Sequence, residues 1–196
     1  IDEWGLSEAC RQNKLWQSKG YKPIRVSVNM SQAQLYQTDV IASIRGALEH
    51  TGLDPQYLEV ELTETMAIQD IEHTVKILER IHEMGVSISM DDFGTGYSSL
   101  SSLKILPINL LKIDKSLIDD IETNDAARSI VKAIVDLGKA MNLEVLAEGV
   151  ETKEQFELLG DLSCDIAQGY YYGKPLPAAE LERLFLARTP EATESV

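Results

Sequence analysis

The stretch VSISMDD, residues 86–92, alternates apolar and small polar side chains and ends on two adjacent acids. This alternation predicts a β-strand with Asp91 and Asp92 at its carboxyl end. The turn Gly94-Thr95-Gly96 follows directly. A single aspartate at such a position is often only a turn or helix-cap residue. Two in succession are better explained as a pair that shares a binuclear metal site, where the metals clamp the attacking and leaving oxygens.

Four other predicted strands end on an acid, an amide or a lysine. They cover residues 26–29, ending on Asn29; 58–61, ending on Glu61; 108–112, ending on Lys112; and 143–148, ending on Glu148. In parallel α/β folds, ligands bind at the carboxyl ends of the strands. Carboxylates gathered there would repel and desolvate one another, and divalent cations relieve this because hard cations take oxygen ligands. The pattern therefore predicts a metal-dependent barrel enzyme.

Three of these strand-end residues also have simpler structural explanations. Asn29 alone fits a turn residue, and the Lys112 ammonium could reach a surface along its aliphatic stem. Glu59 and Glu61 could share a solvated face of an edge strand, although a sheet covered by helices on both faces disfavours this. Beside carboxylates, a lysine is better explained as a group that orients a water or balances phosphate charge. Glu61 and Lys112 are therefore kept as candidate site residues.

Three further polar residues follow predicted strands. Glu64 lies just beyond the second strand and is expected to hold a loop. Glu151 fits a helix N-terminal acid, which the helix dipole favours. Gln168 follows a short sixth strand over 165–167 and could merely satisfy loop amides. Three histidines fall within predicted helices and are interpreted as surface or packing residues: His50, His73 and His82.

The predicted strands alternate with helices through short connections, which indicates a parallel sheet. Helices are predicted over 3–19, from a Ser31/Gln34 capping box through Leu48, from Asp70 to Gly85, and over 125–141, 152–160 and 177–187. Six such strand–helix units are visible, whereas a closed barrel has eight strands. We expect one barrel domain over 1–188 that lacks its first strands, followed by a flexible tail over 189–196.

The composition excludes some classes of function. The 196 residues are 44% hydrophobic and 26% charged, with a net charge of -14. A binder of nucleic-acid polymers would need a basic face, whereas bound metals would let an acidic protein take a phosphate ligand. Cys10 and Cys164 are expected to be reduced thiols in a cytosolic protein. The sequence shows no run of about 18 apolar residues and no signal peptide, and it begins at Ile1, as a piece of a longer protein would.

Six motifs together resemble the EAL-domain family of cyclic di-GMP phosphodiesterases. They are SVNMS (27–31), ELTET (61–65), DDFGTGYSSL (91–100), LKID (111–114), AEGVET (147–152) and QGY (168–170). The resemblance extends over nearly the whole chain, to about Leu186. It implies a modified TIM barrel that hydrolyses one phosphodiester of cyclic di-GMP to linear pGpG in bacterial second-messenger signalling. It also implies two divalent cations, Mg²⁺ or Mn²⁺.

The resemblance also implies residue roles. The metals would be bound by Asn29, Glu61, Asp91, Asp92 and Glu148. Lys112 would position a water ligand, Glu148 would lie close to the nucleophilic water as ligand or base, and Gln168 would help to hold the water or metal shell. Glu64 would anchor the loop over 93–99, which contains Thr95 and Gly96. Glu151 would be a supporting or substrate-side acid.

The Glu-Ala-Leu motif that names the family lies upstream of Ile1 in such proteins and is absent here. We therefore expect the chain itself to be poorly active and to form a homodimer through the gap. The resemblance implies fusion to upstream sensory or GGDEF domains, with this domain in the cytoplasm and any membrane anchor upstream. Two alternatives stay open: a non-catalytic cyclic di-GMP receptor and a protein-interaction module.

Overall fold

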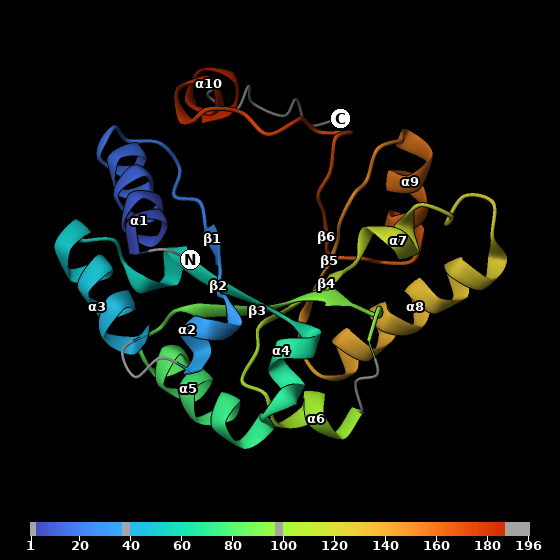
Figure 1. The fold of residues 1–196 in the computed structure, drawn as a ribbon. Helices are drawn as coiled ribbons and strands as arrows, with labels where there is room; N and C mark the ends of the chain where they lie inside the picture. The colour runs from blue at the N-terminus through green and yellow to red at the C-terminus, as the bar shows by residue number, and fades with distance from the viewer. Residues whose placement is uncertain (1–2, 37–39, 97–99, 187–196) are drawn as a thin grey trace.

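The computed structural model describes residues 3–36, 40–96 and 100–186. Within these ranges the chain forms one curled sheet of six parallel strands, ordered as in the sequence (Figure 1). The strands are β1 (Val26–Asn29), β2 (Leu58–Thr63), β3 (Ser87–Phe93), β4 (Leu110–Ile113), β5 (Glu144–Ala147) and β6 (Ile166–Ala167). The predicted parallel α/β architecture is confirmed as a half-barrel whose edge strands are β1 and β6.

The longer helices lie where the periodicity predicts them: the first precedes β1, and each of the others follows a strand. They are α1 (Glu3–Ser18), α3 (Val40–Thr51), α5 (Ile71–Glu83), α8 (Asp125–Ala140) and α9 (Lys153–Asp161). The shorter ones are α2 (Gln32–Tyr36), α4 (Glu64–Gln69), α6 (Leu100–Ile105), α7 (Lys115–Ile118) and α10 (Ala178–Leu181), with the 3₁₀ turn η1 (Pro55–Tyr57) and the π-helical turn η2 (Glu182–Leu186). The single helix predicted from Ser31 is thus two helices, α2 and α3. The tail predicted over 189–196 lies outside the described residues.

Polar caps explain where several helices begin. The Asp70 carboxylate accepts a hydrogen bond from the backbone N–H of His73 at 3.2 Å, which starts α5 as predicted. At Ser31 the expected capping box is present, because the Gln34 side chain accepts from the Ser31 N–H at 3.0 Å. The sequence did not predict α4 or α7, whose six and four residues are too few to show a helical period.

The two faces of the sheet differ sharply in polarity. On the convex face lie buried apolar side chains: Val28, Val60, Ile88, Leu111 and Val145. On the concave face polar side chains predominate, namely Ser27, Glu59, Glu61, Ser89 and Lys112, with the buried Leu110 and Leu146 beside them. The long helices pack outside the curve of the sheet (Figure 1), so the expectation of a sheet covered on both faces is wrong. Apolar and polar side chains alternate along β1, β2 and the first part of β3, because successive side chains of a strand point to opposite faces.

Buried charges inside the half-barrel are paired. The Glu59 side chain is only 3% exposed. It accepts hydrogen bonds from Arg25 Nη1 at 3.0 Å and from Ser27 Oγ at 2.9 Å. Arg25 Nη1 also lies 3.6 Å from the Glu144 carboxylate at the start of β5, so that it links β2 to β5 across the concave side. These contacts stabilise the end of the sheet opposite the strand-end acids.

The segment after β6 returns to the amino-terminal helix. Glu182 forms an ion pair with Lys19 at 2.7 Å and accepts from the Tyr21 hydroxyl at 3.1 Å. Figure 1 shows α10 opposite the middle of the sheet, near the end of α1. Within the part of the chain that the structure describes, no helix is both long and apolar enough to span a membrane.

Replacing Gly138 with alanine tests the packing of α8 on β5. A Cβ at this position would lie 2.3 Å from Val145 Cγ2, and Val145 is fully buried. Alanine gains about 1 kcal/mol in helix propensity over glycine, but overpacking costs roughly 1–3 kcal/mol. We expect Gly138→Ala to lower the free energy of unfolding by about 1 kcal/mol in a urea titration. The matched control is Gly46→Ala in α3, where a Cβ meets nothing within 4 Å, and which is expected to be stabilising; a gain at both positions would contradict the packing argument.

Candidate functional site

A β-bulge places Asp91 and Asp92 side by side. Met90 pairs with Leu111 and Phe93 with Ile113, so two residues of β3 lie opposite the single residue Lys112 of β4. In a regular strand adjacent side chains point to opposite faces, and a bulge changes the direction of one of them. Asp92 takes the left-handed conformation, with φ of 55°, which aspartate tolerates better than most residues. The two successive aspartates of the sequence therefore form the bulge of β3.

The Lys112 ammonium lies at the centre of a cluster of acids. Its Nζ is 2.6 Å from Glu148 Oε1, 3.1 Å from Glu61 Oε1 and 3.1 Å from Asp91 Oδ1. These four side chains come from β2, β3, β4 and the end of β5, and Lys112 is 4% exposed. Burial alone would lower the pKa of Lys112, but the hydrogen bond to Glu148 and the three carboxylate charges outweigh it and raise the pKa above its usual value.

Two acids at the strand ends, Glu148 of the cluster and the neighbouring Asp92, have raised pKa values. Burial raises the pKa of Glu148, and the hydrogen bond from Lys112 opposes this only in part. Burial also raises the pKa of Asp92, as do the negative charges of Asp91 and Asp114. Both carboxyls are thus held in surroundings that disfavour their ionised form, as expected where negative charges gather without enough positive charge.

The pattern of strand-end residues did not identify Asp114 as a residue of the site. It caps α7 by accepting from the Ser116 N–H at 3.0 Å, and its charge acts on Asp92. Asp114 is the last residue of the LKID motif, two positions after Lys112. That spacing from the end of β4 is the signal that could have identified it.

Glu64 contacts the glycine-rich turn after β3. Its side chain is 2% exposed, and one oxygen accepts from the Gly94 N–H at 3.0 Å. A Cβ on Gly96 would lie 2.5 Å from Glu64 Oε1, so the close approach requires a glycine there. The Thr95 hydroxyl donates to the Asp92 carbonyl at 2.9 Å. This turn is therefore tied both to α4 and to the bulge, although residues 97–99 of the loop lie outside the described ranges.

The remaining candidate residues lie at the edges of the cluster. Asn29 is exposed and is the register partner of Glu61. Gln168 is exposed just beyond β6. Glu151 forms an ion pair with Lys115 at 2.8 Å. In the described part of the chain, the ion pairs of Lys112 are formed with Glu61, Asp91 and Glu148 and with none of these three side chains. The structure therefore brings together Glu61, Asp91, Lys112 and Glu148 most closely.

A cavity of about 270 Å³ opens beside Glu148. Its walls come from the loops after β4, β5 and β6: Lys115, Glu148, Gly149, Glu151, Gln168, Gly169 and Tyr170. Both the cavity and the acidic cluster therefore lie at the carboxyl ends of the strands. This is where ligands bind in parallel α/β folds.

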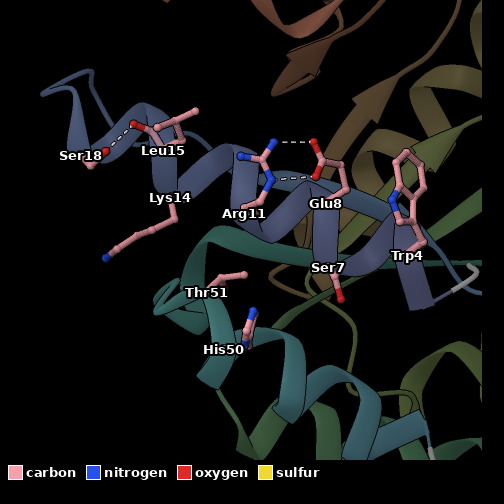
Figure 2. Close-up of a pocket in the computed structure, with 9 residues that line it drawn as sticks. All are labelled: Trp4, Ser7, Glu8, Arg11, Lys14, Leu15, Ser18, His50 and Thr51. Carbon is pink, nitrogen blue, oxygen red and sulfur yellow. Dashed lines mark hydrogen bonds and ion pairs between the residues drawn. The ribbon is translucent and has the colours of Figure 1, made fainter.

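A second cavity of about 430 Å³ lies on the outside of the molecule, between α1 and the end of α3 (Figure 2). Trp4, whose surface is 74% exposed, stands at one end of it. The carboxylate of Glu8 is paired there with Arg11 at 2.6 Å, and His50 lies on the α3 side. This cavity has no cluster of acids among its described lining residues, so it differs in kind from the site at the strand ends.

The donor set of the acidic cluster fits a hard divalent cation. Three carboxylates converge within 3.1 Å of one positive nitrogen. Ser89, the register partner of Glu61 in β3, has a buried Oγ with no hydrogen-bond partner in the described residues. In those residues no group of three or more His, Cys, Asp or Glu side chains is arranged to hold a metal ion; the three carboxylates instead surround the Lys112 ammonium.

The fold and the site together define a protein with a parallel half-barrel. At the carboxyl ends of its strands, acidic side chains surround the Lys112 ammonium. The family model of the EAL domain matches residues 1–175, and the chain belongs to this family.

The relatives come from several bacteria. The bifunctional diguanylate cyclase/cyclic di-GMP phosphodiesterase MucR of Pseudomonas aeruginosa is 45% identical over 92% of this chain and 26% of its own length. The cyclic di-GMP phosphodiesterase NbdA of the same species is 41% identical over 95% of this chain and 24% of its own length. The chain thus spans about a quarter of these relatives.

Solved structures agree with the fold. The PaMucR phosphodiesterase in complex with c-di-GMP has a TM-score of 0.89 at 45% identity, covering 92% of this chain and 73% of that one. Klebsiella pneumoniae BlrP1 with manganese and c-di-GMP has a TM-score of 0.80 at 27% identity, covering 89% and 44%. The half-barrel described above is therefore part of an EAL-type barrel architecture.

Proposed function

We propose that this chain is the catalytic part of a cyclic di-GMP phosphodiesterase, which hydrolyses one phosphodiester to give linear pGpG. The observation that carries the proposal is the cluster of Glu61, Asp91 and Glu148 around Lys112, set by the bulge of β3. The names of MucR and NbdA as cyclic di-GMP phosphodiesterases support the same substrate. The c-di-GMP complex of PaMucR supports binding at this kind of domain.

Divalent cations are part of the proposal. The BlrP1 structures with calcium or with manganese support this class of cofactor, and we infer Mg²⁺ or Mn²⁺, two per site. The proposed ligands are Asn29, Glu61, Asp91, Asp92 and Glu148. Such ions polarise a phosphate and lower the pKa of a bound water.

The chain's own side chains have distinct proposed tasks. Lys112 places a positive charge among the three acids that it contacts, and it holds them at fixed positions before substrate enters. Glu148, whose pKa is raised by burial, is placed to hold or accept a proton from the attacking water. Gln168 and Glu151 line the adjacent cavity, where they would contact the substrate or its water shell. Glu64 keeps Thr95 and Gly96 close to the acids through the turn after β3.

The proposal extends to the parent protein. Because the relatives are about four times longer, we infer a domain over 1–188 within a signalling protein that carries sensory or GGDEF domains upstream. We place this domain in the cytoplasm and expect it to act as a homodimer. Neither inference affects the chemistry assigned to the strand ends.

Hydrolysis of cyclic di-GMP tests the function directly. Two forms are assayed: the chain of 196 residues, and a form extended upstream by about a third of its length, which is enough for two further barrel strands. With Mn²⁺ or Mg²⁺ we expect turnover to pGpG in the extended form and little in the shorter one. EDTA should abolish it, and added Mn²⁺ should restore it, because the proposed ligands are oxygens of hard character. Binding without turnover in both forms would favour a receptor, and neither binding nor turnover an interaction module.

A further inference from the structure

The loop over 148–152 carries Glu148 and is held by a buried amide. Gln155, 5% exposed, accepts from the Glu151 N–H at 2.8 Å and from the Thr152 N–H at 3.2 Å through the same oxygen. Its nitrogen donates to the Ile118 carbonyl in α7 at 3.4 Å. One side chain thus joins the loop after β5 to the segment after β4.

Two other contacts cross between the same segments. Lys115 pairs with Glu151 at 2.8 Å, and the Thr152 hydroxyl donates to the Glu122 carboxylate. We call these contacts, together with those of Gln155, the seam between residues 115–122 and 148–155. One of the two segments begins shortly after Lys112 and the other begins at Glu148, and these two residues form the shortest ion pair of the acidic cluster. That pair joins Lys112, at the end of β4, to Glu148, at the end of β5.

The seam is closely packed as well as hydrogen-bonded. Gly149 has φ of +71°, and a Cβ there would lie 2.3 Å from the Lys115 side chain. On the other side, a Cβ at Gly169 would lie 2.1 Å from the Val150 carbonyl oxygen. The loop therefore has little room to shift while Gln155 keeps its backbone in place.

We propose that Gln155 is a positioning residue, which acts through the loop over 148–152 to hold Glu148 against Lys112. The inference rests on the proposed phosphodiesterase function only for its kinetic consequence. Gln155 touches no reacting group itself. Its effect is geometric, because a displacement of about 1 Å at a reacting group can cost on the order of a hundredfold in rate.

A simpler role for Gln155 is that of a helix cap. It is the N3 residue of a capping box with Thr152 at the start of α9, and such boxes stabilise helices generally. A cap alone would change stability without changing the environment of Lys112. The two roles are therefore separated by measurements on Lys112 and on turnover in variants of equal stability.

Three variants provide the test. Gln155→Met keeps the volume and removes every hydrogen bond of the amide. Gln155→Glu retains an oxygen for the Glu151 and Thr152 N–H groups, as a capping box accepts Glu or Gln, but it loses the donor to the Ile118 carbonyl and places a charge at a buried position. Asp70→Ala removes the cap of α5, whose carboxylate bonds the His73 N–H at 3.2 Å, and serves as the control for lost capping. All are compared below their unfolding transitions, with folding checked by circular dichroism.

The first readout does not depend on activity. In ¹⁵N-lysine-labelled chain without metal, the Lys112 ammonium should show slow proton exchange because it is buried and bonded to Glu148. We expect faster exchange, together with faster deuterium exchange of the Glu151 and Thr152 amides, in Gln155→Met. Asp70→Ala should resemble the wild type at Lys112, and Gln155→Glu should lie between the wild type and Gln155→Met, because it keeps only the bonds to the loop. An unchanged Lys112 signal in Gln155→Met overturns the proposal even if no hydrolysis is ever observed.

The second readout uses turnover in the upstream-extended form. We expect Gln155→Met to lower kcat by about 10- to 100-fold with little change in KM, Gln155→Glu to lower kcat less than Gln155→Met, and Asp70→Ala to retain the wild-type kcat. Equal losses in Gln155→Met and Asp70→Ala would mean that Gln155 is only a cap. The wild-type rate tests the proposed function, whereas the ratio between variants tests the positioning role, so the two can fail separately.

Discussion

Replacing Lys112 with methionine is expected to destabilise the metal-free protein by about 3–5 kcal/mol, the usual cost of removing one partner from a buried ion pair. Glu61, Asp91 and Glu148 would then converge with no positive charge among them, although they lie within 3.1 Å of Nζ in the native protein. For a chain of this size the melting temperature should fall by roughly 10 °C. Differential scanning calorimetry in EDTA measures it, and hydrolysis by the extended form should fall by at least about a hundredfold.

The matched control is Lys153→Met. Lys153 forms an exposed i,i+4 pair with Glu157 at 2.7 Å, and such pairs contribute little, so its melting temperature should match the wild type. Added Mn²⁺ should stabilise Lys112→Met more than the wild type, because a cation would again offset the three carboxylates. Equal melting temperatures for Lys112→Met and wild type in EDTA would show that Lys112 does not hold the acids together.

Asp91→Asn should lower hydrolysis of cyclic di-GMP by at least about a thousandfold in the extended form, since it removes a proposed metal ligand. The fold should persist, because the asparagine oxygen can still accept from the Asp92 N–H, as Asp91 does at 3.1 Å. Binding of cyclic di-GMP should be retained or only weakened, as measured by isothermal titration calorimetry. The loss should therefore lie in turnover.

Asp136→Asn is the control for this substitution. Asp136 is an exposed acid on α8, paired only with Lys132 in the described contacts, and the variant should hydrolyse at the wild-type rate. Wild-type turnover by Asp91→Asn would remove Asp91 from the proposed metal site. If Asp91→Asn fails to fold while Asp136→Asn folds, the two successive aspartates have a structural role in the bulge instead.

Much of the fold could be predicted because its signals are local. The strand at 86–92 and the helix that begins at Asp70 were predicted from alternation and from a cap, and the structure contains both. The polarity of the concave face was not anticipated, since the sequence alone does not reveal which face of a parallel sheet the helices cover. Glu59 is buried by pairing with Arg25 rather than by a second helical layer.

The site could be predicted in its residue types but not in its geometry. Residues far apart in sequence, such as Glu61 and Glu148, are both strand-end acids, and strand register then brings both to Lys112. Asp114 was missed because its capping bond to Ser116 looks like any Asx cap. Gln155 was missed because a buried amide in a capping box has no chemical signature in sequence; its significance comes from the two segments that it joins.

The bulge of β3 also determines where this chain can change length. Strand side chains alternate with a period of two, so the extra residue at Asp91–Asp92 sets the phase of all that follows in β3. Deleting either aspartate would turn Phe93, now 8% exposed beneath the helices, toward the concave face. It would also draw Gly94 away from Glu64. A deletion here would thus damage packing and chemistry together, so variation among natural relatives at this point should occur by substitution rather than by insertion or deletion.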